Sequence, residues 1–149
     1  MDQETLTQEP GPFMRKLFDM TPFNTHLGLE LGDFSLERLV VRFAKRTELT
    51  LPGGTLHGGA LAAAIDVAGA YHAGIAIHQR MSREGGDADR STGVRTISLN
   101  VDFLKALTAE TYTATTTILH TGANIVRVRA ECVDDRDDLV ATASLNFSY

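Results

Sequence analysis

One apolar stretch near the middle of the chain limits what this sequence can fold into. The eighteen residues from Ala60 to Ile77 carry a single charged side chain, Asp66. Much of the stretch is alanine and glycine, and a central aspartate would cost about 2.5–3.5 kcal/mol in a bilayer, so no membrane span is expected. A helix on a protein surface would show one polar face. The stretch therefore predicts a helix that protein covers on nearly every side.

Shorter segments on both sides of this helix alternate in polarity, as strands do. In one of them Leu39, Val41 and Phe43 fall on the same side. A polar stretch without periodicity, 79–93, predicts a long loop. The predicted strands are 27–31, 39–43, 97–103, 112–119, 125–133 and 139–149, with turns at 32–35 and 134–138.

The order of the elements predicts how the central helix is buried. A short helix over 12–20, with Phe13, Leu17 and Met20 close to one face, is expected to act as a lid or cover. Strands that follow one another through hairpins form an antiparallel sheet, so the fold class is α+β. One sheet cannot cover a helix on all sides, and a second copy of the chain is therefore expected to complete the burial.

Length and composition agree with a single domain. The chain has 149 residues, of which 43% are hydrophobic and 22% are charged, an ordinary balance for one globular domain. The opening MDQETLTQEP is polar and acidic, unlike a signal peptide. We expect a polar tail over 1–11 and one domain over 12–149.

Charge, cysteine and histidine content exclude several classes of function. Fourteen basic against nineteen acidic residues give a net charge of −5 without a basic stripe, so nucleic-acid binding is not expected. A single cysteine, Cys132, excludes a disulfide framework and indicates a reducing compartment, taken here as the cytoplasm. The five histidines lack the spacing of metal ligands, and no GxSxG motif supports a serine hydrolase.

The residues around the central helix resemble a known family. The triplet HGG (57–59) opens the helix, Asp66 follows nine positions after the histidine, and a later strand ends in FL (103–104). In combination these motifs are similar to those of the PaaI-like hotdog-fold acyl-CoA thioesterases of the 4-hydroxybenzoyl-CoA thioesterase superfamily, over about residues 12–149. The resemblance implies an antiparallel sheet wrapped around one long central helix, and dimers that often pair into tetramers. It also implies an acyl-CoA substrate, active sites between two subunits, and no metal or organic cofactor.

The resemblance implies roles for individual residues. The backbone N–H of Gly58, which follows His57, would polarise the thioester carbonyl. Asp66 would activate or orient water, and the hydroxyl of Thr96 would assist the acid. The family commonly has an asparagine six residues before the histidine, where it helps to bind the thioester, and this chain has Leu51 instead.

The chemistry of a helix N-terminus agrees with these implied roles. Its first N–H groups are unpaired and carry partial positive charge, so Gly58 and Gly59 offer donors to a developing oxyanion. Nine helical residues advance about 13.5 Å and turn through about 900°, which separates Asp66 from His57. One substrate cannot touch both within one subunit, so the two groups of a site are expected to come from two chains. Activity would then require a homodimer or a homotetramer.

Further side chains are candidates for binding the two ends of an acyl-CoA. Lys105 is the first candidate for the phosphates of coenzyme A, and Arg95, Arg80 and Arg90 are weaker ones. The walls around the acyl group are expected to come from Phe13, Phe18, Phe23, Tyr71 and the 79–93 loop.

Other interpretations stay open on the sequence alone. Leu51 favours a non-catalytic hotdog protein that binds an acyl-CoA or another acyl ligand. A hotdog hydratase or dehydratase would need an Asp/His pair in one site. Asp66 can also be a structural carboxylate, His57 a helix cap, and Thr96 an ordinary strand threonine.

Overall fold

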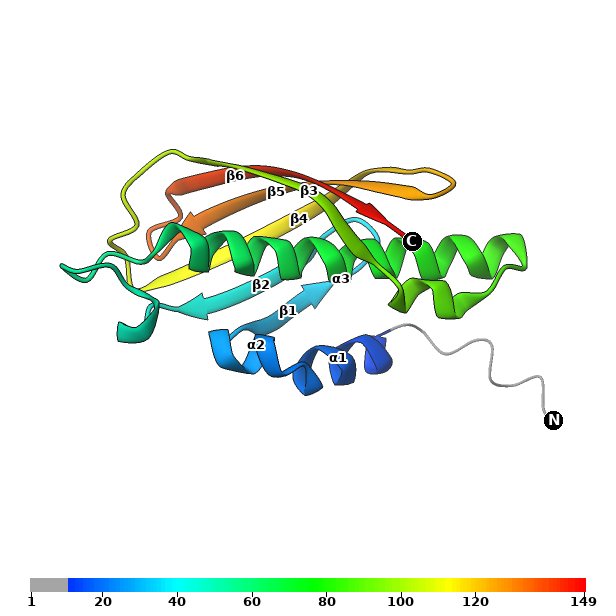
Figure 1. Cartoon of the computed structure of the whole chain (residues 1–149), viewed down its shortest axis with the longest axis horizontal. Coiled ribbons are helices and arrows are strands. Elements are labelled where there is room, and N and C mark those ends of the chain that lie inside the picture. Colours follow the sequence, from blue (N-terminus) through cyan, green and yellow to red (C-terminus); the bar gives the residue numbers. More distant parts are fainter. Residues whose placement is uncertain (1–10) are drawn as a thin grey trace.

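The computed structural model describes residues 11–149 apart from the side chains of 88 and 89, and it contains a six-stranded antiparallel sheet in the order β1-β2-β4-β5-β6-β3 (Figure 1). The strands are β1 (Glu30–Phe34), β2 (Leu39–Ala44), β3 (Arg95–Phe103), β4 (Thr111–Thr121), β5 (Ile125–Asp134) and β6 (Leu139–Ser148). The sheet curves around one long helix, α3 (Gly58–Glu84), which confirms the predicted α+β arrangement. Of the predicted tail 1–11, only Gly11 is among the described residues, and it begins a helix.

Helix α3 is longer than predicted. It runs for 27 residues before Gly85 ends it in the left-handed conformation at φ 69°. The predicted loop 79–93 is therefore wrong over its first six residues, where an i,i+4 ion pair between Arg80 and Glu84 favours helix. The rest of that stretch contains a short 3-10 helix, η3 (Ala88–Thr92). By length and composition alone α3 could cross a membrane, but 67% of its most apolar window is buried within the molecule, as in a core helix.

Alternate residues of the central strands β4 and β5 form the inner face of the sheet that packs on α3. From Val126 to Cys132, every second side chain of β5 is buried and those between are exposed. Burial raises the pKa of the Cys132 thiol to about 12, so the predicted core cysteine is confirmed and is unreactive. Gly69 brings α3 close to β6, because a Cβ atom there would lie 2.9 Å from the ring of Phe147.

The first predicted strand, 27–31, is partly wrong. Leu27 ends a short helix, α2 (Pro22–Leu27), and Gly28 closes that helix in the left-handed conformation at φ 68°. Strand β1 starts only at Glu30, so residues 32–34 of the predicted turn belong to the strand and the turn lies at 35–38. Proline at the first position and glycine just past the end are the signals that mark α2 in the sequence.

Helix α1 (Gly11–Met20) turns a different face inward from the predicted one. Met14 and Phe18 are buried, and the ring of Phe18 meets that of Tyr71 on α3 at 4.9 Å. The three residues predicted to face inward are exposed instead, by 56% at Phe13, 36% at Leu17 and 68% at Met20. Residues four apart share a helix face, so Met14 and Phe18 form an equally regular pair, and the contact with Tyr71 decides between the two faces.

Strand β3 lies at one edge of the sheet and pairs only with β6. Every one of its nine residues is exposed except the half-buried Val101. Ile97, Leu99 and Phe103 are large apolar side chains left open along this edge. A long, apolar, unpaired edge is a template for pairing with a further strand.

Candidate functional site

A glycine-rich turn, residues 50–57, precedes the start of α3. It follows a short 3-10 helix, η2 (Thr47–Leu49), and the Leu51 N–H donates to the carbonyl of Thr55 at 2.8 Å. Gly53 and Gly54 adopt φ values of 101° and 83°, which residues with side chains rarely adopt. The side chain of Leu51 is 44% exposed on this turn and, being aliphatic, offers no hydrogen bond to a ligand.

His57 caps the helix with its own side chain. Its Nδ1 atom accepts a hydrogen bond from the Gly59 N–H at 2.8 Å. An accepting Nδ1 places the proton of a neutral imidazole on Nε2. The N–H of Gly59 is therefore engaged, contrary to the expectation that both glycine donors are available. Between residues 11 and 149, the N–H of Gly58 has no hydrogen-bond partner.

The ring of Phe103 covers Gly58. A Cβ atom at Gly58 would lie 3.2 Å from Cζ of this ring, so a larger residue would push against it. Phe103 is the last residue of β3, which means that the edge strand ends over the start of α3. The FL motif marks this position in the sequence, although no role for Phe103 was predicted from it.

Asp66 and Thr96 lie together, although 30 positions separate them in the chain. The Thr96 hydroxyl donates to Oδ1 of Asp66 at 2.8 Å. Asp66 is half-buried while its neighbours Ile65 and Val67 are buried, so the carboxylate lies on a side of α3 that the sheet leaves open. Within one chain, α3 is therefore open at this position, which the predicted second copy would have to cover. The pair joins α3 to the edge strand β3.

The Gly58 N–H and the Asp66 carboxylate do not converge within one chain. Eight helical residues separate them, which corresponds to about 12 Å along the axis. The carbonyl group of one substrate cannot contact both. A site that uses both groups needs them from two copies of α3.

A hollow of about 330 Å³ lies beside the start of α3. The N-terminal region supplies Phe23 and His26 to its lining, and α3 with its cap supplies His57, Gly59 and Ala63. Phe23, one of the predicted walls around an acyl group, is therefore close to the glycine turn. Apolar and polar side chains meet here, as in sites for small organic ligands.

The predicted phosphate-binding cations differ in how far they are engaged. Lys105 forms an ion pair with Asp138, its Nζ lying 2.6 Å from Oδ2. Arg90 stacks on the ring of Tyr149 at 4.9 Å and donates to the carbonyl of the same residue. Arg95 is exposed at the start of β3, one position before Thr96. Of these cations, Arg95 is the one nearest in the chain to the predicted acid pair.

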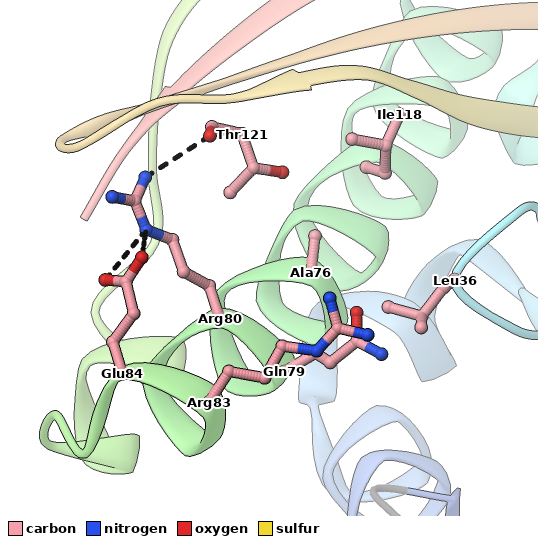
Figure 2. A pocket seen from close by; sticks show the side chains of 8 residues that line it. All are labelled: Leu36, Ala76, Gln79, Arg80, Arg83, Glu84, Ile118 and Thr121. Atoms are coloured by element: carbon pink, nitrogen blue, oxygen red, sulfur yellow. Dashed lines mark hydrogen bonds and ion pairs between the residues drawn. The ribbon is translucent and has the colours of Figure 1, made fainter.

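Arg80 lines a separate hollow of about 590 Å³ at the other end of α3 (Figure 2). Its Nε atom pairs with Oε1 of Glu84 at 3.1 Å, and its guanidinium donates to the carbonyls of Thr121 and Gly122. These contacts hold the side chain against the turn between β4 and β5. The guanidinium of Arg80 thus connects the C-terminal end of α3 to the turn between β4 and β5.

A buried histidine lies between these two ends of α3. Nε2 of His72 contacts the Leu36 carbonyl at 3.2 Å, and Nδ1 contacts the Thr116 hydroxyl at 2.9 Å. A carbonyl only accepts, so Nε2 carries the proton and Nδ1 accepts from Thr116. Burial lowers the pKa of His72, which favours this neutral form. In the described part of the chain, no group of three or more His, Cys, Asp or Glu side chains is placed to hold a metal ion.

Residues 53–141, more than half of the chain, match the family model of the thioesterase superfamily. The chain belongs to this superfamily. It is also 30% identical, over 140 residues, to the medium/long-chain acyl-CoA thioesterase YigI of Escherichia coli strain K12, an alignment that spans 85% of this chain and 84% of that protein. Membership confirms the resemblance drawn from the HGG, Asp66 and FL motifs, and with it the expectation of a thioester hydrolase.

Solved structures of the superfamily confirm the predicted hotdog fold. A Shewanella oneidensis protein related to the thioesterase superfamily matches with a TM-score of 0.83 and 22% identity, over 94% of this chain and 95% of that one. The PaaI protein of the E. coli phenylacetic acid degradation operon matches with a TM-score of 0.75 and 20% identity, over 97% and 95% of the two chains. At these identities the likeness concerns the fold alone.

Proposed function

We propose that this thioesterase hydrolyses acyl-CoA thioesters, with Asp66 as the group that activates water and the Gly58 N–H as the donor to the carbonyl oxygen. The observation that carries the proposal is the hydrogen bond from Thr96 to Asp66. It holds one carboxylate oxygen on an open face of α3 and leaves the other without a hydrogen bond among the described residues. The name of the related YigI proteins supports an acyl chain of medium or long length.

The proposed reaction uses water and groups of the chain itself. Asp66 takes a proton from water as the water oxygen adds to the thioester carbon. The oxygen of the carbonyl gains negative charge and accepts a hydrogen bond from the Gly58 N–H, at the positive end of α3. The carbon–sulfur bond then breaks, the carboxylic acid forms, and the thiolate of coenzyme A leaves with the proton that Asp66 took from water, which restores the carboxylate.

The proposal requires two copies of the chain. Gly58 and Asp66 lie about 12 Å apart along one helix, so each site would take Gly58 from one subunit and Asp66 from its partner. The unpaired apolar edge of β3 supports a homodimer, which could pair further into a homotetramer. Residues 12–149 would act as a single domain. A cytoplasmic location is part of the same proposal, and the presence of one unpaired cysteine supports it.

The other predicted site residues are proposed to cap the helix or to bind coenzyme A. His57 serves as the cap that orients the turn, and Gly59 serves as its partner. Arg95 and Lys105 are proposed to meet the phosphates of coenzyme A, which requires Lys105 to exchange Asp138 for the ligand. Leu51 leaves carbonyl polarisation to the backbone alone.

A second candidate function rests on the identity of Leu51. A side chain without a donor at this position favours an acyl-CoA-binding protein that does not catalyse hydrolysis. A hydratase or dehydratase is less well supported, because the side-chain partner of Asp66 is a threonine rather than a histidine.

Release of free thiol from a panel of short, medium, long-chain and aryl acyl-CoAs tests the proposal. Wild type should turn over at least one class, and Asp66→Asn, which keeps the size of the side chain, should lower kcat at least about a hundredfold. Thiol release by wild type that survives in Asp66→Asn contradicts the role of Asp66. Binding of acyl-CoA without any thiol release supports the binding protein instead.

A further inference from the structure

A small hollow lies between α1, α3 and η3, one helical turn beyond Asp66. It has a volume of about 180 Å³. Ala70 and Gly74 of α3 form its floor, and Met14, Leu17 and Val94 contribute to its walls. Its polar lining residues are Tyr71, Ser91 and Thr92, and none of the described residues that line it is Asp, Glu, Lys, Arg or His. The hollow of Figure 2, in contrast, contains Arg80, Arg83 and Glu84.

Tyr71 forms an aromatic wall of this hollow, and its hydroxyl is already hydrogen-bonded within the protein. The Tyr71 hydroxyl lies 2.8 Å from the Thr21 hydroxyl and 3.2 Å from the Leu17 carbonyl. It therefore has partners within the protein and does not call for a polar ligand. The hollow suits an uncharged, apolar group.

Two of the lining elements lead directly to the Asp66–Thr96 pair. Ala70 follows Asp66 by four residues, so the two share a face of α3 and lie about 6 Å apart along its axis. Val94 precedes Thr96 by two residues on the segment that enters β3. An apolar chain attached to a carbonyl at Asp66 can therefore extend along this face of α3 into the hollow.

Gly74 limits the hollow at its far end. It lies about 12 Å from Asp66 along the helix. A Cβ atom at Gly74 would come within 3.1 Å of the Ser91 carbonyl oxygen and 3.4 Å of the Met14 methyl group. The backbone of η3 and the side chain of α1 thus close on the helix here, and they restrict how far a bound chain can extend.

We propose that this hollow binds the acyl chain of the substrate, and that the acyl chain and the catalytic carboxylate therefore belong to the same subunit. The proposal rests on the proposed hydrolysis of acyl-CoA. It adds a division of labour between subunits, in which one chain supplies Gly58 and its partner supplies Asp66 together with the acyl subsite. Ala70 and Leu17 then determine which chain lengths are accepted.

The first test changes the size of the hollow from two sides. Ala70→Leu fills the floor, and it should lower kcat/KM for dodecanoyl-CoA relative to butanoyl-CoA at least about tenfold, within the range for methylene-scale changes in an apolar pocket. Leu17→Ala should shift the same ratio in the opposite direction. Ala123→Leu, the same change on the exposed turn between β4 and β5, and Met20→Ala on α1 are the matched controls and should leave the ratio unchanged. A ratio unaffected by both hollow variants overturns the proposal.

A binding measurement separates failure of this subsite from failure of the proposed hydrolysis. S-dodecyl-CoA is a thioether that cannot be hydrolysed, and calorimetry gives its Kd for wild type and Ala70→Leu. Weaker binding to the variant, by about tenfold or more, supports the subsite even if wild type releases no thiol. Equal binding overturns the subsite even if wild type is an active thioesterase.

Mixed dimers test the division between subunits. Two affinity tags isolate dimers of one Asp66→Asn chain and one chain that retains Asp66, so that a single site remains active. Ala70→Leu should change the chain-length ratio when it is placed on the chain that retains Asp66, and should have no effect on the Asp66→Asn chain. The reverse pattern assigns the acyl chain to the subunit that supplies Gly58 and contradicts the proposal.

Discussion

The polar groups in the two halves of α3 differ in how far their hydrogen-bonding capacity is filled. In the second half, both nitrogens of His72 have partners and Arg80 makes several contacts with neighbouring elements. In the first half, the Gly58 N–H has no partner within residues 11–149, and Asp66 has one, on the edge strand. Groups whose bonding capacity is filled stabilise the fold, while groups with capacity left can bind a substrate. The comparison predicts that mutations in the two halves separate activity from stability.

The largest effect outside Asp66 itself is expected at Thr96. Thr96→Val removes the hydroxyl that orients the carboxylate but keeps a residue that strands favour. We expect kcat/KM to fall by about tenfold to a hundredfold, which is about 1.4–2.7 kcal/mol, with an unchanged Tm. Thr96→Ser keeps the hydroxyl and should retain most of the activity in the same thiol-release assay. Full activity in Thr96→Val would make Thr96 an ordinary strand threonine.

His72→Leu should show the opposite pattern, a loss of stability without a loss of activity. The change removes both hydrogen bonds of a buried side chain, and the free energy of unfolding should fall by about 1–3 kcal/mol. Urea unfolding measures this loss, and kcat of the folded variant should match wild type. His78→Leu, on the same helix and less buried, is the control. Equal losses in the two variants would show that the bonds of His72 contribute little.

The pH dependence of stability is a second test of the role of His72. Burial lowers its pKa in the folded state below the value of about 6.5 expected in the unfolded chain. Below about pH 6.5 the His72 imidazole binds a proton in the unfolded state but not in the folded state. The free energy of unfolding therefore falls as the pH decreases toward the folded-state pKa. Urea unfolding at pH 7.5, 6.5 and 5.5 should show a smaller pH-dependent loss for His72→Leu than for wild type. Identical losses would mean that other groups dominate the acid sensitivity.

The smallest effect is expected at Arg80. Its ion pair with Glu84 is exposed to solvent, and exposed pairs contribute little. Arg80→Met should lower Tm by a few degrees at most and leave KM for acyl-CoA unchanged. Glu84→Gln, which removes the same ion pair, is the matched variant. A raised KM in Arg80→Met alone would restore Arg80 as a phosphate-binding residue.

Sequence patterns predicted the elements whose residues repeat with a clear period. The apolar run around Asp66 corresponds to one buried helix, and the alternation in β4, β5 and β6 corresponds to strands with one covered face, whereas the alternating residues of β3 lie exposed at the edge of the sheet. The pairing of Asp66 with Thr96 was anticipated through the family motif, because no periodicity connects residues on different elements. The face of α1 was wrong since Phe13 and Met14 each begin a regular apolar spacing, and only the contact with Tyr71 distinguishes them.

The availability of individual hydrogen-bond donors was the least predictable part of the site. The sequence places Gly58 and Gly59 together at a helix start, but the rotamer of His57 decides which N–H is taken. The same holds for Arg80, whose guanidinium is held by carbonyls of a distant turn. Which donors remain free depends on side-chain geometry after folding and cannot be predicted from residue types alone.

The end of β3 over Gly58 has a consequence for how activity depends on the amount of enzyme. The strand that carries Thr96 and Phe103 is also one of the two edges of the sheet. If that edge joins two subunits, dilution below the dissociation constant of the dimer would separate each Asp66 from its partner's Gly58 while both chains stay folded. Specific activity would then rise with protein concentration, and the abundance of the enzyme would regulate its own turnover rate.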